Sequence, residues 1–167
     1  LLNSQPMGFY SPSQLCQDAQ RHGVELLPPC INHSHWEHKI DYQTKQPRLR
    51  LGLCLVKGLS ESLVSQLVSC RQQDGPFQSI GNCLDRLTQQ IHYGEQLEQA
   101  LKRLAASDSF HSLEKNRYQS YWQIQQYRPS AVLKGNSAHR LALAEPSEVA
   151  HVEQDYRHTG LSLRRHP

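Results

Sequence analysis

The first periodic segment of the chain predicts a short amphipathic helix. Residues 11–14 read Ser-Pro-Ser-Gln, which is the spacing of a capping box with proline at the first helical position. Leu15 and Ala19 then fall on one face, and Gly23 is suited to end the helix because glycine tolerates the conformation that follows a last helical turn. The sequence therefore predicts a helix over residues 11–22.

Two runs of alternating residues predict a β-hairpin. Residues 24–29 are largely apolar and end in two prolines, which favours an extended exit from the first helix. In the two runs that follow, side chains of one kind recur at every second position, which is the period of a strand. These positions are Trp36, His38, Ile40 and Tyr42 in the first run, and Leu49, Leu51, Leu53 and Leu55 in the second. Since residues 43–47 are polar and turn-like, a hairpin is the simplest arrangement.

The hydrophobic period changes to that of helices from Ser60 onward. Ser60 is a good N-cap, and Glu61 suits the positive N-terminal end of a helix. An Asp-Gly-Pro run at residues 74–76 ends this helix. Its apolar stripe is predicted at Leu63, Val64, Leu67 and Val68.

Two further amphipathic helices follow, separated by a break at Tyr93 and Gly94. Their apolar positions recur at intervals of three and four residues, which marks one face of a helix. These positions are Ile80, Cys83, Leu84 and Leu87, and then Leu97, Ala100, Leu101, Leu104 and Ala105.

A fourth helix of this series is predicted over residues 113–127, before Pro129. It carries Tyr118, Tyr121 and Trp122. Aromatic side chains at helical spacing belong to a core more often than to a surface that stacks on nucleic-acid bases. We therefore expect these three residues in the core, with base stacking as the alternative.

The end of the chain reads as a linker and one last helix. Residues 128–146 contain proline, glycine, serine and asparagine with little periodicity, so we expect a linker there. Ser147 then caps a short helix that Gly160 ends. Taken together, the pattern predicts a mainly α protein with a small β-hairpin.

Composition limits the class of protein. The chain has 167 residues, 37% of them apolar, with a formal net charge of +3. Its mean hydropathy is −0.67. No run approaches the roughly 20 apolar residues of a membrane span, and the first residues show no signal peptide, so a cytoplasmic protein is expected. The five cysteines form no C-x-x-C pair, which favours reduced thiols that fill the core.

The segment that leads into the Ser60 helix carries the clearest functional signal. An apolar-x-Gly-apolar turn before a capped helix, with a second helix after Gly75, is the pattern of a helix-hairpin-helix. Gly58 tolerates a positive φ and has no Cβ, so a phosphate can approach the N–H groups at the helix start. An ordinary turn is the alternative, since short matches of this kind are common. The predicted DNA-binding residues are Lys57, Gly58, Leu59 and Ser60, with added charge from Arg48, Arg50 and Arg71.

A second polar cluster suggests zinc, and other catalytic patterns are missing. Cys30, His33, His35 and His38 are close in sequence, but strand alternation places His35 on the face opposite His38, and no second ligand pair follows at a finger-like distance. A zinc-stabilised module therefore stays a minor alternative, and we assign no metal ligands. The sequence contains no hydrolase elbow, phosphate loop, zinc-protease motif or paired acid motif, so no catalytic residues are predicted.

The order of these motifs resembles a known family over essentially the whole chain. The matching segments are LLNSQPMGFY at 1–10, HGV at 22–24, LRLGL at 49–53, VKGL at 56–59, GPF at 75–77, YR at 156–157, TGLSL at 159–163 and HP at 166–167. They resemble bacterial C-family DNA polymerases, above all the error-prone paralogue of the DNA polymerase III alpha subunit. The resemblance implies that the sequence is a fragment of a longer DNA-directed DNA polymerase.

The resemblance implies a domain organisation. Residues 1–47 would be the end of the fingers with the β-hairpin, 48–127 a tandem helix-hairpin-helix module that grips duplex DNA, 128–146 a linker, and 147–167 a helix leading towards an OB domain. Lys57 to Ser60 match the first hairpin. The second would fall between Leu87 and Leu97, where no clear turn motif is present.

The resemblance also implies chemistry and partners. The parent enzyme would transfer nucleotides with Mg²⁺, in DNA replication and in damage-induced translesion synthesis, through carboxylates outside this segment. The expected partners are the duplex DNA phosphate backbone and the remainder of the polymerase chain, with no membrane. No clamp-binding peptide is found in the linker, so clamp binding is not supported. A stand-alone, non-enzymatic helix-hairpin-helix adaptor is the main alternative.

Overall fold

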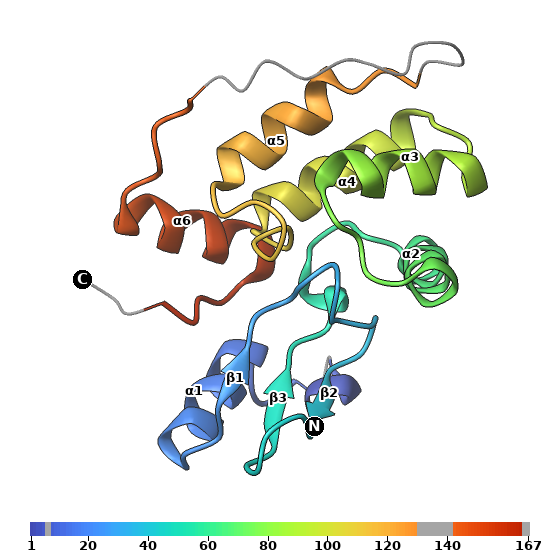
Figure 1. The fold of residues 1–167 in the computed structure, drawn as a ribbon. Helices are drawn as coiled ribbons and strands as arrows, with labels where there is room; N and C mark the ends of the chain where they lie inside the picture. The colour runs from blue at the N-terminus through green and yellow to red at the C-terminus, as the bar shows by residue number, and fades with distance from the viewer. Residues whose placement is uncertain (6–7, 130–141, 165–167) are drawn as a thin grey trace.

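The computed structural model describes residues 1–5, 8–129 and 142–164. The elements in chain order are η1 (Leu2–Ser4), α1 (Pro12–Arg21), β1 (Leu26–Leu27), β2 (Lys39–Asp41), β3 (Arg48–Arg50), η2 (Leu53–Leu55), α2 (Glu61–Asp74), α3 (Ile80–Gln90), α4 (Glu95–Ala106), α5 (Arg117–Gln126) and α6 (Glu148–Thr159). The sheet and α1 form one end of the molecule, and α2–α5 form the other (Figure 1). The expected mainly α fold with a small β unit is confirmed.

Helix α1 has the predicted N-terminus. The hydroxyl of Ser11 accepts a hydrogen bond from the Gln14 N–H at 3.2 Å, and the Gln14 side chain accepts from the Ser11 N–H at 2.9 Å. Gly23, just past the helix, has a φ of 81°. The capping box and the glycine therefore set the two ends of this helix as the sequence predicts.

The predicted hairpin is present but shorter, and it gains a third strand. Strand β2 pairs antiparallel with β3, with Ile40 opposite Leu49. The segment predicted only as extended contains β1, which pairs parallel with β3 and places Leu26 opposite Leu49. The prediction that the second run alternates as far as Leu55 is wrong, because β3 ends at Arg50 and the 3-10 helix η2 occupies Leu53–Leu55, where the Leu55 N–H donates to the carbonyl of Gly52.

Helices α2, α3 and α4 build the main core. The hydroxyl of Ser60 caps α2 by accepting from the Leu63 N–H at 3.4 Å. In α2, Val64 and Leu67 are buried, while Leu63 and Val68 are partly buried against the same core. In α3 and α4, every predicted apolar position is buried. The helical periodicity of the sequence therefore identifies this core correctly.

Helix α5 differs from the prediction in its start and in its orientation. It begins at Arg117, because the Asn116 side chain accepts hydrogen bonds from the first N–H groups of the helix. Tyr118 and Tyr121 are 40% and 38% exposed, so the expectation that they belong to the core is wrong. Helix α5 instead buries Arg117, Gln119, Ser120 and Ile124.

The C-terminal helix follows the prediction. Ser147 caps α6 by accepting from the Ala150 N–H at 3.3 Å, and Gly160 ends it in the left-handed conformation. Most of the expected linker, residues 130–141, lies outside the described residues, as do residues 6–7 and 165–167. All five cysteines are free, four of them buried and Cys54 half-buried, which agrees with thiols that fill the core. In the described part of the chain, no helix is long and apolar enough to cross a membrane.

Candidate nucleic-acid interface

The predicted hairpin turn is a tight turn built around Gly58. The Leu59 N–H donates to the carbonyl of Val56 at 3.3 Å, and Gly58 has a φ of 80°. A positive φ at the third position of such a turn favours glycine, because other residues are strained there. The turn therefore depends on the residue that the sequence singles out.

The turn presents backbone donors to solvent at the start of α2. Lys57, Gly58 and Ser60 are exposed, as is Glu61. The N–H groups of Gly58, Ser60 and Glu61 donate to no acceptor within the described residues. These donors lie at the N-terminal end of a 14-residue helix, whose dipole favours an anion. The geometry is therefore suited to an oxygen-rich anion such as a phosphate.

Arg103 lies against this turn, and sequence reasoning missed it. Its guanidinium donates a hydrogen bond to the carbonyl of Gly58. A Cβ on Gly58 would lie 2.6 Å from the Arg103 Cζ atom, so a side chain here would displace the guanidinium. No local signal relates the two residues, because they are 45 positions apart. The structure thus adds an exposed cation from α4 to the turn.

Lys57 is engaged by the end of α6. Its ammonium donates to the carbonyl oxygens of Arg157 at 3.0 Å and Tyr156 at 3.4 Å. The backbone N–H of Lys57 donates to the carbonyl oxygen of His158 at 2.9 Å. A cation suits these carbonyls because the C-terminal end of a helix carries partial negative charge. An ammonium has three donors, so the exposed Lys57 keeps one N–H for solvent or a ligand.

The three other predicted arginines make contacts inside the protein. Arg71 is only 8% exposed, and its guanidinium donates to the carbonyls of Ile31 at 2.7 Å and Ser34 at 3.0 Å. Arg50 donates to the carbonyl of Pro28 at 3.0 Å. Arg48 lies 3.4 Å from a carboxylate oxygen of Asp41. These contacts fix the loops around the sheet, so we leave the three arginines out of the interface proposed below.

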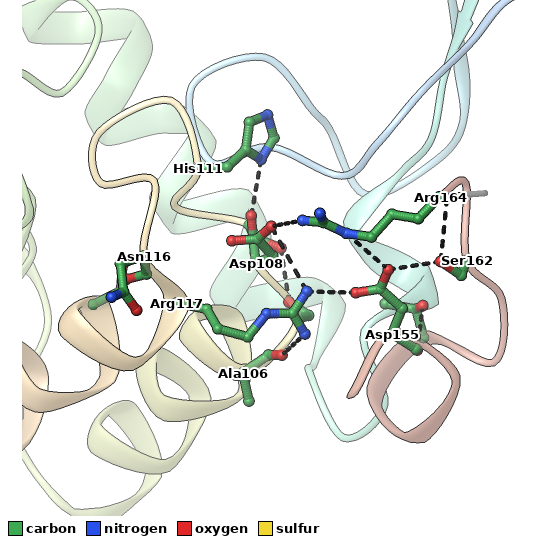
Figure 2. Close-up of polar contacts among 12 residues, drawn as sticks. Ala106, Asp108, His111, Asn116, Arg117, Asp155, Ser162 and Arg164 are labelled. Atoms are coloured by element: carbon green, nitrogen blue, oxygen red, sulfur yellow. Dashed lines mark hydrogen bonds and ion pairs between the residues drawn. The ribbon is translucent and has the colours of Figure 1, made fainter. Parts of the chain in front are cut away.

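A network of two arginines and two aspartates joins α6 to the turn between α4 and α5 (Figure 2). Arg117, whose side chain is 1% exposed, lies 2.6 Å from Asp155 and 3.7 Å from Asp108. Arg164 lies 2.9 Å from Asp108 and 3.5 Å from Asp155. The hydroxyl of Ser162 donates to Asp155 at 2.8 Å. Each carboxylate therefore faces two guanidinium groups.

Helix α6 consequently braces two turns at once. Its last carbonyls hold Lys57 beside the Gly58 turn, and Asp155 holds Arg117 at the start of α5. Neither contact is visible in the sequence, since each joins residues that are distant along the chain. Through these contacts, α6 fixes the position of the Gly58 turn relative to the start of α5.

The region expected to hold a second hairpin is a plain helix connection. Helix α3 ends at Gln90, and α4 begins after Gly94, which makes no side-chain cap. Helix α4 packs most extensively on α5 instead. The turn that joins these two helices contains Asp108, which has a φ of 60°. The closest helical pair in the described structure is thus α4–α5.

The candidate zinc residues do not gather into a ligand set. Nowhere in residues 1–5, 8–129 and 142–164 do three or more His, Cys, Asp or Glu side chains lie so that they could hold a metal ion. The Cys30 thiol lies 3.3 Å from the Ser112 hydroxyl. The Nδ1 atom of His38 accepts from the Gly52 N–H at 3.1 Å, which leaves the ring proton on Nε2, near Cys54. Burial lowers the pKa of His38, so the ring is held neutral.

Comparison with known proteins defines the class of this chain. It belongs to the helix-hairpin-helix motif family, whose model matches residues 23–120. That range contains the sheet, the Gly58 turn and α2–α4, together with the start of α5.

Curated relatives of this chain are named Error-prone DNA polymerase. The one from Vibrio campbellii is 42% identical over 171 residues, and the one from Burkholderia pseudomallei is 40% identical over 182 residues. The one from Hahella chejuensis is 39% identical over 171 residues. Each alignment covers 100% of this chain and 16% of the relative, so the chain spans about 16% of their length. The resemblance to the error-prone C-family polymerases is confirmed.

Proposed function

We propose that this chain holds duplex DNA, without sequence choice, for a longer error-prone DNA-directed DNA polymerase. The observation that carries the proposal is the exposed Gly58 turn, with N–H groups of Gly58 and Ser60 that no acceptor among the described residues takes up, and with Arg103 beside it. Backbone amides and a guanidinium recognise phosphate oxygens and do not read base edges. Such contacts position a protein along DNA.

The cations act together with the amides. Arg103 contacts the turn directly through its guanidinium, and Lys57 adds a second positive charge from the turn itself. Each cation that neutralises a phosphate releases a counterion, which makes binding weaker as salt rises. In this proposal the Leu59 N–H serves the turn and not the phosphate, because it already donates to Val56. Leu59 packs partly against the core and anchors the turn.

The activity of the longer protein is part of the proposal. The relatives' name supports nucleotidyl transfer onto DNA, and we propose that it serves replication and synthesis across damaged templates. The described residues hold no group of acidic, cysteine and histidine side chains that fits a metal ion, so we assign Mg²⁺ no ligand in this chain. Since bacterial DNA lies in the cytoplasm, the proposal places the protein there.

The proposal is tested by duplex binding with the whole 167-residue chain. Two labelled duplexes of unrelated sequence should bind with affinities that agree within about twofold, and both affinities should fall with added salt. Gly58→Val places a β-branched residue at positive φ and displaces Arg103, so it should lower affinity by about tenfold or more.

The matched control is Gly23→Val. Gly23 has a similar φ of 81° with nothing within 4 Å of an added Cβ, so this variant introduces similar backbone strain far from the turn. It should bind duplex DNA as the wild type does. If Gly58→Val and Gly23→Val bind equally well, the turn is not the DNA contact.

A stand-alone adaptor remains the second candidate function, supported by the family match alone. The two candidate functions predict reading frames of different length. A polymerase requires a continuous reading frame several times longer than this chain, because the chain spans about 16% of its relatives. A reading frame limited to this module would support the adaptor.

A further inference from the structure

Helix α5 presents its aromatic side to solvent. Tyr118 and Tyr121 are three positions apart, so their side chains lie on one face of the helix, and both are more than a third exposed. Trp122 lies next to them and is half-buried. The helix buries Arg117 and Gln119 instead. Aromatic side chains at helical spacing are usually buried, so within the described residues these two tyrosines form a stacking surface that no other aromatic ring covers.

The charge of this face is suited to a polyanion. Helix α5 contains no aspartate or glutamate. Exposed Lys115 precedes it and exposed Arg128 follows it, so a cation lies near each end. On the neighbouring helix, the carboxylate of Glu98 is paired with Lys102 at 2.6 Å, and before α5 the carboxylate of Glu114 accepts a hydrogen bond from the Asn116 N–H. Surfaces that bind single-stranded nucleic acid combine aromatic side chains with cations in this way.

The α5 face that carries Tyr118 and Tyr121 and the Gly58 turn both contact helix α4, on neighbouring sides of it. Arg103 reaches the turn, while its neighbour Lys102 lies close enough to Tyr121 to interact with it electrostatically. Consecutive residues of a helix point about 100° apart. The two surfaces are therefore on adjoining sides of the same helix, and Figure 1 shows α5 lying along α4.

We propose that the face formed by Tyr118, Tyr121 and Trp122 stacks on the bases of single-stranded DNA. The two tyrosine rings each take one base, and Lys115 and Arg128 contact the adjoining phosphates. This second site goes beyond duplex binding at the turn. It has a different ligand, and it depends on bases where the turn depends on phosphates.

The experiment compares a thymidine 20-mer with a strand of equal length and charge that lacks its bases. The wild-type chain should bind the thymidine strand about tenfold or more tightly than the abasic strand, because stacking needs the bases. Tyr118→Ala/Tyr121→Ala should lose most of this difference and bind the two strands almost equally. Tyr42→Ala is the matched control, because Tyr42 is 75% exposed and lies beside the sheet.

A second measurement locates the bound strand. The chain has two tryptophans, so Trp36→Phe leaves Trp122 as the only indole. Its fluorescence should be quenched by the thymidine strand and unchanged by the abasic strand. Loss of folding is controlled by thermal unfolding of each variant, and a double tyrosine variant that does not fold is replaced by Tyr118→Leu/Tyr121→Leu, which keeps the apolar volume but removes the rings.

Three outcomes overturn the proposal. The first is equal binding of the two strands by the wild type, and the second is a tyrosine variant that behaves like Tyr42→Ala. The third is self-association of the wild type that the tyrosine variants abolish, which would show that the face binds a second copy of the chain. Duplex binding measured on the same variants separates this test from that of the turn, since Gly58→Val should keep its preference for bases over the abasic strand.

Discussion

The guanidinium of Arg103 donates a hydrogen bond to the carbonyl of Gly58, across 45 residues of sequence. This contact places a cation beside a turn whose N–H groups face solvent. It also fixes the peptide that follows Gly58, so that the donors of Ser60 and α2 stay in one orientation. A guanidinium positioned in this way both shapes the turn and adds charge for a phosphate.

Loss of Arg103 and loss of Lys57 should change the salt dependence of DNA binding alike but affect different parts of the structure. Arg103→Ala and Lys57→Ala should each lower the slope of log affinity against log salt by about 1 for duplex DNA. Lys57→Ala should also lower the free energy of unfolding by about 1 kcal/mol, because the last carbonyls of α6 lose their donor. Arg103→Ala should instead loosen the Gly58 turn, because the carbonyl of Gly58 loses its donor. Lys45→Ala, at an exposed lysine of the hairpin loop, is the control. An unchanged slope in Arg103→Ala would remove Arg103 from the interface.

Glu61 should oppose DNA binding at the turn. Its exposed carboxylate lies in the first turn of α2, where it favours the helix but repels a phosphate. Glu61→Gln should therefore tighten duplex binding by about twofold at low salt, while costing the helix about 0.5 kcal/mol. Titration at low and high salt measures the effect, which should vanish at high salt because of screening. Weaker binding by Glu61→Gln would argue against an anion at this helix start.

Gly52 should be intolerant of alanine although its backbone conformation is ordinary. An added Cβ would collide with the backbone carbonyl of Trp36 and lie 2.5 Å from the carbonyl carbon of Glu37. Backbone cannot move aside as a flexible side chain can, so Gly52→Ala should cost about 3 kcal/mol or more in urea unfolding. Gly23→Ala, with no neighbour within 4 Å, should cost about 1 kcal/mol from its positive φ alone. If Gly52→Ala and Gly23→Ala lowered the free energy of unfolding equally, the close approach of Gly52 to the Trp36 and Glu37 backbone would be contradicted.

Removal of Arg117 should be among the most damaging single changes. Arg117→Met leaves Asp155 and Asp108 partly buried with one partner fewer, and we expect a loss of about 3–5 kcal/mol. Arg117→Met/Asp155→Asn should recover part of that loss, because it also removes an uncompensated charge. Arg21→Ala, at an exposed arginine of α1, should stay within about 0.5 kcal/mol of the wild type. A mild effect of Arg117→Met would mean that α6 is held by its apolar contacts.

Stability should fall when the pH is lowered from 7 to 5. Burial lowers the pKa of His38, and also that of His35, His151 and His158. Below the ordinary histidine pKa of about 6.5, the unfolded chain takes up protons that the folded chain does not, which favours unfolding. Each such histidine contributes a slope of at most about 1.4 kcal/mol per pH unit.

His38 offers a direct check of that dependence. His38→Asn keeps an acceptor for the Gly52 N–H but removes the titrating group, so the dependence of unfolding on pH should become flatter. The wild type, measured in parallel, is the reference. Chemical unfolding at a series of pH values measures both. A steeper fall in the free energy of unfolding between pH 7 and 5 in His38→Asn would contradict the expected direction of the His38 contribution.

The fold was largely predictable because its signals are local. The capping box of α1, the Ser60 cap of α2 and the glycine that ends α6 each act within one helical turn. The apolar faces of α3 and α4 follow from a period of three and four residues. The start of α5 was not predicted correctly: the sequence pattern places it at residue 113, whereas Asn116 caps a helix that begins at Arg117.

The candidate site was predicted only in part. Gly58 and the capped start of α2 follow from neighbouring residues, so the sequence alone determines the turn. Tertiary contacts decide which cations serve it: Arg71 is buried against the loop of Ile31, Lys57 is held by α6, and Arg103 arrives from α4. They also decide that α5 buries Arg117, where it pairs with Asp155, and exposes Tyr118 and Tyr121. Caps and periodicity act between neighbours and can be read along the chain, whereas ion pairs across 38 to 56 residues depend on where the folded backbone brings charges together.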